Sequence, residues 1–165
     1  MKKIITLLGI FLTINLCQAQ ILQSDSHKKE WDIISYNIKD EGISLELSSK
    51  QLQANASLLF YSTSDISALK TKFLEELQAG VGAKTMKYIG EAEVNKWEGF
   101  KYLSITEQSV LAHLTVIVPC GGKRVLLADM SVPVGSLNAK VSWNRLQTTW
   151  IQSYNRWVEI LAQRR

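Results

Sequence analysis

Cysteine, proline and histidine are scarce in this sequence, with two residues of each type among 165. Two isolated prolines cannot build a proline-rich linker, and the chain contains no low-complexity tract or internal repeat. The cysteines and histidines do not fall at the spacing of metal ligands. We therefore expect neither a repeat protein nor a metal site, and no motif indicates a cofactor.

Long hydrophobic runs are also missing, with one exception near the amino terminus. Residues 4–16 carry no charge and follow Lys2 and Lys3. A membrane-spanning helix needs roughly 20 apolar residues, so this run is too short to remain as a span. A basic start, a short apolar stretch and small residues after it predict a secretory signal peptide.

The residues after the run offer two processing routes. Cys17 and Ala19 are small, which predicts cleavage between Ala19 and Gln20 and cyclisation of the new terminal Gln20. Lipid attachment at Cys17 is the main alternative, but bulky Leu16 stands where lipoprotein processing prefers a small residue. The third possibility is that the apolar run is kept as a core or membrane helix. The sequence thus predicts a secreted or periplasmic protein, or alternatively one anchored through Cys17.

Cleavage divides the chain into a signal peptide (1–19), a flexible polar arm (20–30) and a single globular domain (31–165). The formal charge of +4 falls to +2 without Lys2 and Lys3, and acidic residues interrupt the remaining basic ones. We therefore expect no nucleic-acid partner. The mature chain retains only Cys120, so it cannot form an internal disulfide and must be stabilised by its core.

Apolar periodicity predicts an α+β domain. The first part contains a short strand or ordered lead-in (31–38), two strands (43–48 and 57–61) and a helix (65–79) capped near Asp65. Four strands in quick succession then predict an antiparallel meander (86–94, 100–106, 110–118 and 123–132). Gly80 and Gly82 should end the first helix, and residues 119–122 and 95–99 should form turns.

A long amphipathic helix is predicted to begin after Ser142 and to close the fold. Its apolar stripe contains three tryptophans, and burying even one large aromatic ring contributes a few kcal/mol. Apolar residues on both faces of the last two strands indicate a sheet covered on both sides. We expect an antiparallel sheet of about six strands with helices packed on it, in ββαββββα order.

This element order resembles the PsbP/DcrB-like group of α/β/α sandwiches. The likeness rests on "ISLELS" leading to "SLLFYS", on "SDISALKTKFLEEL", and on "AEVNKWEGFKYLSIT" leading into "HLTVIVPCGGKRVLLADM" and the closing helix. It covers about residues 41–160 and includes no invariant motif. The resemblance implies a non-enzymatic secreted or periplasmic protein with a binding or assembly role, although such proteins are typically lipid-anchored.

Catalytic chemistry has little support in the sequence. His27 lies in the arm, and His113 lies in a predicted strand, facing either solvent or a satisfied pocket. Cys120 would need a nearby base, but seven extended residues place it about 20 Å from His113 along the chain. Cys120 is therefore interpreted as a turn residue, whose exposed thiol could pair between chains.

The acidic pairs Glu75–Glu76 and Glu91–Glu93 are interpreted as solvated, the second sharing a strand face with Lys87. Trp97 lies in the predicted loop 95–99 and Phe100 follows it directly, and both are candidate contacts for a partner. We expect no catalytic residue and no enzyme. The first hypothesis is a binding or assembly protein of the bacterial envelope with a protein partner. The alternatives are an inhibitor or immunity-type protein that occludes a toxin or hydrolase, and a hydrolase with an unrecognised site.

Overall fold

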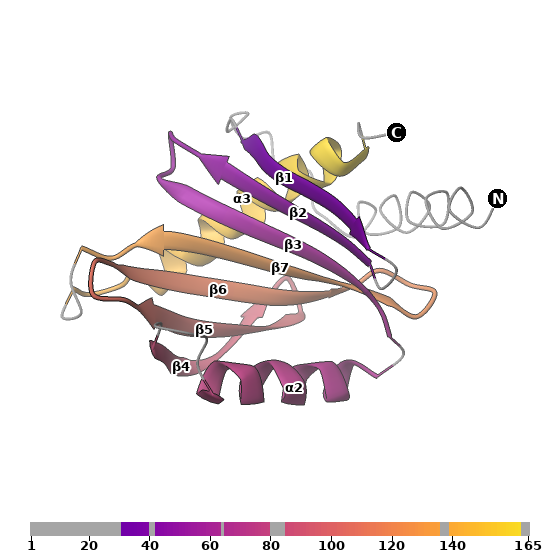
Figure 1. Ribbon diagram of the computed structural model, residues 1–165, viewed down its shortest axis with the longest axis horizontal. Helices are drawn as coiled ribbons and strands as arrows, with labels where there is room; N and C mark the ends of the chain where they lie inside the picture. Colours follow the sequence, from indigo (N-terminus) through magenta and orange to yellow (C-terminus); the bar gives the residue numbers. More distant parts are fainter. Residues whose placement is uncertain (1–30, 40–41, 64, 80–84, 136–138, 163–165) are drawn as a thin grey trace.

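The computed structural model describes residues 31–39, 42–63, 65–79, 85–135 and 139–162, which form an antiparallel sheet and two helices (Figure 1). The seven strands lie in the spatial order β1-β2-β3-β7-β6-β5-β4. Along the chain the elements are β1 (Asp32–Lys39), β2 (Gly42–Ser49), β3 (Ala54–Ser62), α2 (Ile66–Ala79), β4 (Thr85–Val94), β5 (Trp97–Ile105), β6 (Val110–Pro119), β7 (Arg124–Pro133) and α3 (Trp143–Ala162).

The predicted count of about six strands and the order ββαββββα are wrong. Residues 32–39 form a full strand ahead of the predicted first one, so the order is βββαββββα. The pairing of β1 with β2 shifts between Ile33 and Ser35, and Ile34 is the extra residue. This β-bulge breaks the period of two by which a strand is recognised.

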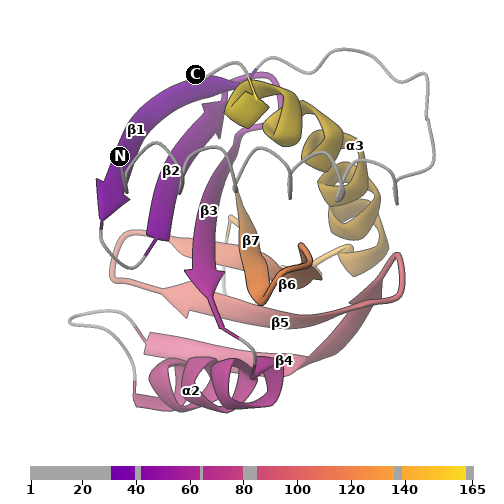
Figure 2. The ribbon, with the colours of Figure 1, turned by 90° about the vertical axis from the view of Figure 1, so that its right-hand side faces the viewer.

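The sheet separates two apolar layers. On β6, Ala112 and Leu114 face α3 and pack in one cluster with Trp150, whereas Ile117 belongs to a second cluster beneath Phe73 of α2. Successive residues of a strand point to opposite faces, so the two helices cover different sides of the sheet. Figure 2 shows α3 and α2 on different sides of the curved strands. The expectation that both faces are covered is confirmed for these central strands.

The closing helix is a core element, as its aromatic stripe predicts. Trp150 and Trp157 are fully buried, and Trp150 Nε1 donates a hydrogen bond to the carbonyl of Ala128 on β7 at 3.1 Å. Trp31, just before β1, meets Trp157 edge to face with ring centroids 5.2 Å apart. Contacts of this kind fix α3 across several strands of the sheet.

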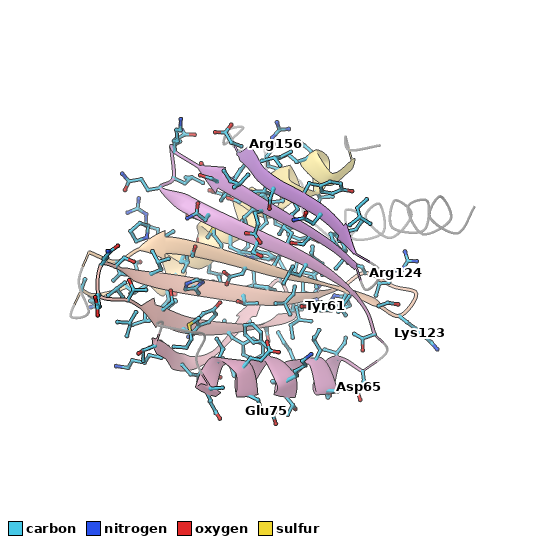
Figure 3. All side chains as sticks on the ribbon, viewed as in Figure 1. Tyr61, Asp65, Glu75, Lys123, Arg124 and Arg156 are labelled. Atoms are coloured by element: carbon cyan, nitrogen blue, oxygen red, sulfur yellow. The ribbon has the colours of Figure 1, made fainter. Side chains whose placement is uncertain are left out.

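The first helix begins where its cap predicts. Oδ1 of Asp65 accepts a hydrogen bond from the amide of Ala68 at 2.8 Å, which satisfies one of the free amides of the first turn (Figure 3). The helix runs to Ala79, as predicted, and Glu75 points away from the sheet. The glycines at 80 and 82, predicted to end it, lie outside the described residues.

The turns of the meander set the register of its strands. The predicted hairpin after β6 is confirmed, with Gly121 and Gly122 at φ 72° and 57°. The turn after β4 is shorter than predicted, because Asn95 and Lys96 alone reverse the chain. Gly99 is therefore a strand residue, where a Cβ would lie 2.8 Å from the carbonyl oxygen of Thr115.

The predicted signal peptide and arm (residues 1–19 and 20–30), including Cys17, Ala19, Gln20 and His27, lie outside the described residues. Neither helix in the described part of the chain is both long and apolar enough to cross a membrane.

Candidate functional site

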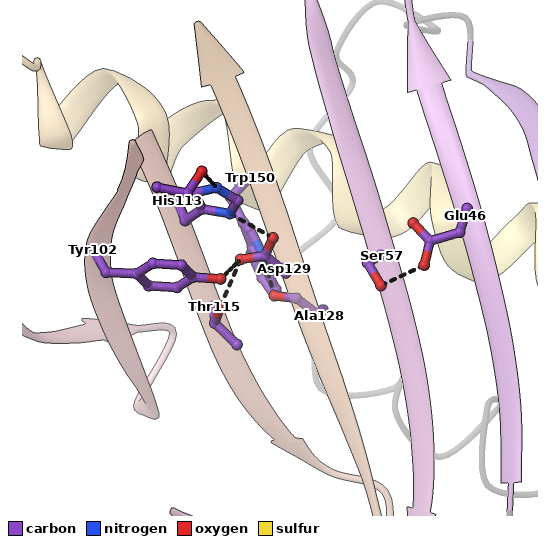
Figure 4. A network of polar contacts seen from close by, with 9 residues as sticks. Glu46, Ser57, Tyr102, His113, Thr115, Ala128, Asp129 and Trp150 are labelled. Carbon is purple, nitrogen blue, oxygen red and sulfur yellow. Dashed lines mark hydrogen bonds and ion pairs between the residues drawn. The ribbon is translucent and has the colours of Figure 1, made fainter. Parts of the chain in front are cut away.

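Five polar side chains gather on the face of the sheet that α2 partly covers. Tyr102 and Ser104 come from β5, His113 and Thr115 from β6, and Asp129 from β7 (Figure 4). The strand register brings them together, because Tyr102 lies opposite His113 and Thr115 lies opposite Asp129. We call these five residues the polar network.

A serine, a histidine and an aspartate are linked in sequence within this network. Oγ of Ser104 lies 2.8 Å from Nε2 of His113, and Nδ1 of His113 lies 2.9 Å from Oδ2 of Asp129. An ionised carboxylate only accepts hydrogen bonds, so Nδ1 carries the hydrogen. The contact between Nε2 and the hydroxyl of Ser104 completes the chain of hydrogen bonds, and Ser104 is its donor when Nε2 carries no hydrogen. This connectivity is the one found in serine hydrolases.

The second carboxylate oxygen of Asp129 is also satisfied. Oδ1 accepts hydrogen bonds from the hydroxyls of Thr115 at 2.6 Å and Tyr102 at 3.2 Å. Burial by itself would raise the pKa of Asp129, but the charge and hydrogen bond of His113, with those of Thr115 and Tyr102, outweigh it and lower the pKa. Asp129 is therefore ionised at neutral pH.

Tyr102 closes one side of the network. Its ring stacks on that of His113, with centroids 4.5 Å apart and an interplanar angle of 12°. Burial, and then the charge of Asp129, raise the pKa of Tyr102, so the phenol keeps its hydrogen. Phe73 of α2 lies 6.0 Å from the same ring, centroid to centroid. The network is thus joined to the apolar layer beneath α2.

As an active centre, the network would need a serine hydroxyl that a substrate can reach. Ser104 is 3% exposed, whereas a nucleophilic hydroxyl must reach the carbonyl it attacks. The side chains of His113 and Asp129 retain 13% and 18% exposure. In this conformation the five groups satisfy one another and tie three strands together.

A smaller polar pair continues the same row across the sheet. Ser57 on β3 lies opposite Asp129 on one side and Glu46 of β2 on the other, and its hydroxyl donates to Oε1 of Glu46 at 2.8 Å (Figure 4). Both residues are half-buried. Polar groups therefore run from β2 to β5 on one face.

The sequence analysis missed the network because its members come from three strands whose register was unknown. One signal was present: Tyr102 with Ser104, and His113 with Thr115, are polar pairs two residues apart on neighbouring strands, and Asp129 interrupts the apolar run of a third. The short hairpins fix the pairing. Counting back from each turn would have placed these residues side by side.

The structure gives Trp97 and Phe100 packing roles. Trp97 is 8% exposed and contacts Trp150 and Tyr154 of α3, while Phe100 is fully buried and lies 5.5 Å from Phe73, centroid to centroid. Neither ring is available at the surface in this conformation. Their contact with a partner stays an untested prediction, and the burial of both rings does not favour it.

Cys120 and His113 lie in different layers. Cys120 is 2% exposed, belongs to the cluster that α3 covers, and its Sγ lies 3.4 Å from the carbonyl oxygen of Val118. The network around His113 is on the other face. The expectation of an exposed thiol at Cys120 is therefore wrong. For His113 the sequence left two possibilities, solvent or a pocket of hydrogen-bond partners, and the structure places it in the pocket.

The predicted solvated acids are exposed, but one detail is wrong. Glu75, Glu76, Glu91 and Glu93 are all exposed. However, a bulge between Tyr88 and Gly90 places Lys87 opposite Leu103 and Glu91 opposite Phe100, so Lys87 and Glu91 do not share a face. Instead Glu91 pairs with Lys70 of α2 at 3.1 Å.

A groove of about 340 Å³ lies between α2 and the β4–β5 hairpin. Nζ of Lys70 lies within it, 3.1 Å from Glu91 and 3.3 Å from Glu98. Hydrogen bonds with these two carboxylates raise the pKa of Lys70. The charges of this groove largely neutralise one another. Among the described residues, no three histidine, cysteine or acidic side chains form a group that could hold a metal ion.

The outer edge of β1 is the most exposed apolar feature. Among the described strands β1 pairs only with β2. Ile34 and Ile38 are 66% and 58% exposed, the highest values for large apolar residues in the described chain. No charge occurs between Asp32 and Lys39. Uncharged, β-branched edges of this kind readily pair with another strand.

The opposite edge is better protected against pairing. Both edge strands contain a bulge, but β4 also carries Lys87, Glu91 and Glu93. Charged side chains on an edge strand discourage pairing with another strand. The two edges of the sheet are thus not equivalent.

Comparison with known proteins does not assign the chain to a family. No family model matches the sequence, and no curated protein matches it either. The resemblance to the PsbP/DcrB-like group therefore stays a prediction.

Proposed function

We propose that this protein is an exported binding or assembly protein of the bacterial cell envelope, and that it holds a protein partner without transforming it. The observation that carries the proposal is the contrast between the sealed polar network and the open edge of β1. Ser104 is 3% exposed, whereas Ile34 is 66% exposed on an edge strand whose outer side pairs with no other described strand. The partner contributes an extended segment that adds to the sheet beside β1.

Two features of β1 support this mode of binding. Main-chain groups along an open edge supply hydrogen bonds to an added strand, while alternate side chains supply specificity. Ile34 and Ile38 would become buried, and each fully buried isoleucine contributes about 2 kcal/mol. The uncharged stretch 33–38 offers no side chain that would repel an apolar partner strand.

Site-specific cross-linking tests the proposal. A photo-reactive amino acid replaces Ile38 in the protein produced in its native bacterium, and the same probe replaces Lys72 on exposed α2 as the control. We expect a discrete envelope protein to cross-link at position 38 and not at 72. If the cross-linked protein is a toxin or a hydrolase, the result supports the inhibitor or immunity role over the assembly role.

A charge substitution then tests the edge itself. Ile34→Lys should abolish the cross-link from position 38, whereas Ile89→Lys on β4 should leave it intact. Both residues are exposed, at 66% and 42%, so each change should alter stability by no more than about 0.5 kcal/mol. Equal loss of the cross-link in both variants, or no loss in either, contradicts binding at β1.

One observation favours a second candidate, acyl transfer. Ser104, His113 and Asp129 have the hydrogen bonds of a catalytic triad at 2.8 and 2.9 Å. This activity requires an opening that exposes Ser104. A fluorophosphonate probe distinguishes the candidates: labelling that is lost in Ser104→Ala and retained in Ser57→Ala supports a hydrolase, and absence of labelling supports binding alone.

A further inference from the structure

A second groove, of about 420 Å³, opens at the other end of the strands from the β6–β7 hairpin. Three segments line it: the turn between β2 and β3, the end of β7, and the start of α3 with the residues before it. Figure 1 shows these segments together on the left side of the molecule. The volume is within the range of sites for small ligands, about 300–1,000 Å³.

The floor of the groove is apolar. Leu146 of α3 is 4% exposed, and half-buried Leu52, Val132 and Val141 pack against the main core from three different segments. All four residues line the groove. Leu52, Val132 and Val141 are only partly covered by the protein, so an aliphatic group placed there would lose contact with water and gain contact with the core.

The rim of the groove carries charge of one sign. Of the described residues that line the groove, Lys140 and Arg145 are the charged ones, and both are exposed. Neither forms an ion pair with another described residue, in contrast to Lys70 in the first groove. Arg145 lies in the first turn of α3, which contains no acidic residue to offset the positive end of the helix dipole. An anion is therefore favoured at this rim.

We propose that this groove binds a small amphipathic anion, namely a carboxylate with a short aliphatic chain. The chain lies on the floor formed by Leu52, Val141 and their neighbours, and the carboxylate faces Lys140 and Arg145. Neither feature alone suffices, because exposed lysines and arginines attract anions weakly and an apolar floor alone would accept any oily group. Their combination in one cavity selects the class of ligand. The site is separate from β1 and does not depend on the proposed partner.

Titration calorimetry with octanoate tests this site on the purified protein. Octan-1-ol keeps the chain and removes the charge, octylamine reverses the charge, and inorganic phosphate keeps a negative charge and removes the chain. We expect octanoate to bind at least tenfold more tightly than each of the other three. Equal affinity for octan-1-ol, or no detectable heat with octanoate, overturns the proposal.

Paired variants locate the anion. Lys140→Gln with Arg145→Gln should weaken octanoate binding at least tenfold. Lys72→Gln with Lys87→Gln removes the same net charge elsewhere and should change the affinity less than twofold. A similar loss in both double variants would show a general charge effect and contradict the assignment. All four residues are exposed, so the folded state should tolerate both sets.

Methyl NMR of the unaltered protein locates the chain without any variant. Octanoate should shift the methyl signals of Leu52, Val132 and Val141 before those of Ile34 and Ile38 on β1. Shifts confined to β1 would place the ligand on the exposed edge and refute the groove.

Discussion

Nδ1 of His113 lies 2.9 Å from Oδ2 of Asp129, and this contact joins strands β6 and β7 at a point where the neighbouring side chains are mostly buried. Asp129 also receives the hydroxyls of Thr115 and Tyr102. A carboxylate that satisfies three donors at once is stable there only while all of its partners remain. The polar network therefore predicts large and specific effects of substitution.

Asp129→Ala should destabilise the protein by about 3 kcal/mol, because it leaves three donors without their acceptor. Asp129→Asn keeps one acceptor oxygen for Thr115 and Tyr102 but places an amide donor beside Nδ1 of His113. The ring of His113 has a tautomer that accepts from this amide, so Asp129→Asn should cost less than Asp129→Ala. Urea unfolding followed by tryptophan fluorescence measures both changes. Glu46→Ala is the matched control: it removes a single hydrogen bond, the one from Ser57, and the expected loss is about 1 kcal/mol. Equal losses at Asp129 and Glu46 would contradict the central role of the network.

The lowered pKa of Asp129 predicts a defined loss of stability in acid. Because the folded protein holds this carboxyl below its ordinary value of 3.8, the unfolded chain binds its proton first as the pH falls. The stabilisation is complete above 3.8 and is lost as the pH falls through the folded value. Urea unfolding from pH 7 to pH 3 should show a smaller acid loss in Asp129→Asn than in the unaltered protein. Identical pH profiles would refute the shift.

Two buried tryptophans on α3 provide a matched comparison. Trp150 Nε1 donates to Ala128, whereas Trp157 Nε1 is buried and has no hydrogen-bond partner among the described residues. Trp150→Phe and Trp157→Phe each remove similar volume, but only the first removes a hydrogen bond and leaves the carbonyl of Ala128 unpaired on that side. We expect Trp150→Phe to cost about 1 kcal/mol more in urea unfolding. A larger loss for Trp157→Phe would show that packing outweighs the hydrogen bond.

The helices were predictable because their signals are local. Asp65 as a cap and an apolar residue at every third or fourth position place α2 at its observed bounds, and the stripe containing Trp150 and Trp157 places α3 against the core. Each signal depends on residues within a few turns of one another. No knowledge of the rest of the fold was needed.

The features that escaped prediction depend on register or on bulges. The bulge at Ile34 left residues 31–38 open between a short strand and an ordered lead-in, and the bulge before Gly90 moved Glu91 away from the face of Lys87. An extra residue reverses the sides of all residues beyond it, and apolar periodicity alone does not reveal it. The contact of Ser104 with His113 likewise exists only once β5 and β6 are paired.

Burial of Cys120 predicts an unreactive thiol. At 2% exposure it should resist a thiol-reactive chromogenic disulfide while the protein is folded, and react fully in denaturing urea. Non-reducing electrophoresis of the native protein should show no dimer linked through Cys120. Rapid labelling without urea would mean that the turn after β6 opens readily, and it would restore the expectation of pairing between chains.

The proposed role in the envelope requires that the protein is exported and that its signal peptide is removed. The basic start, the apolar run 4–16 and small residues at Cys17 and Ala19 predict a mature chain that begins at Gln20 and has lost one ammonia by cyclisation. Intact-mass analysis of the protein from the native bacterium measures this directly. Ala19→Arg should block the cut and retain the full-length chain in the membrane fraction, whereas Ala79→Arg, an exposed position at the end of α2, should not affect processing. A mass that includes acyl chains on Cys17 would replace the free exported form with a lipid-anchored one.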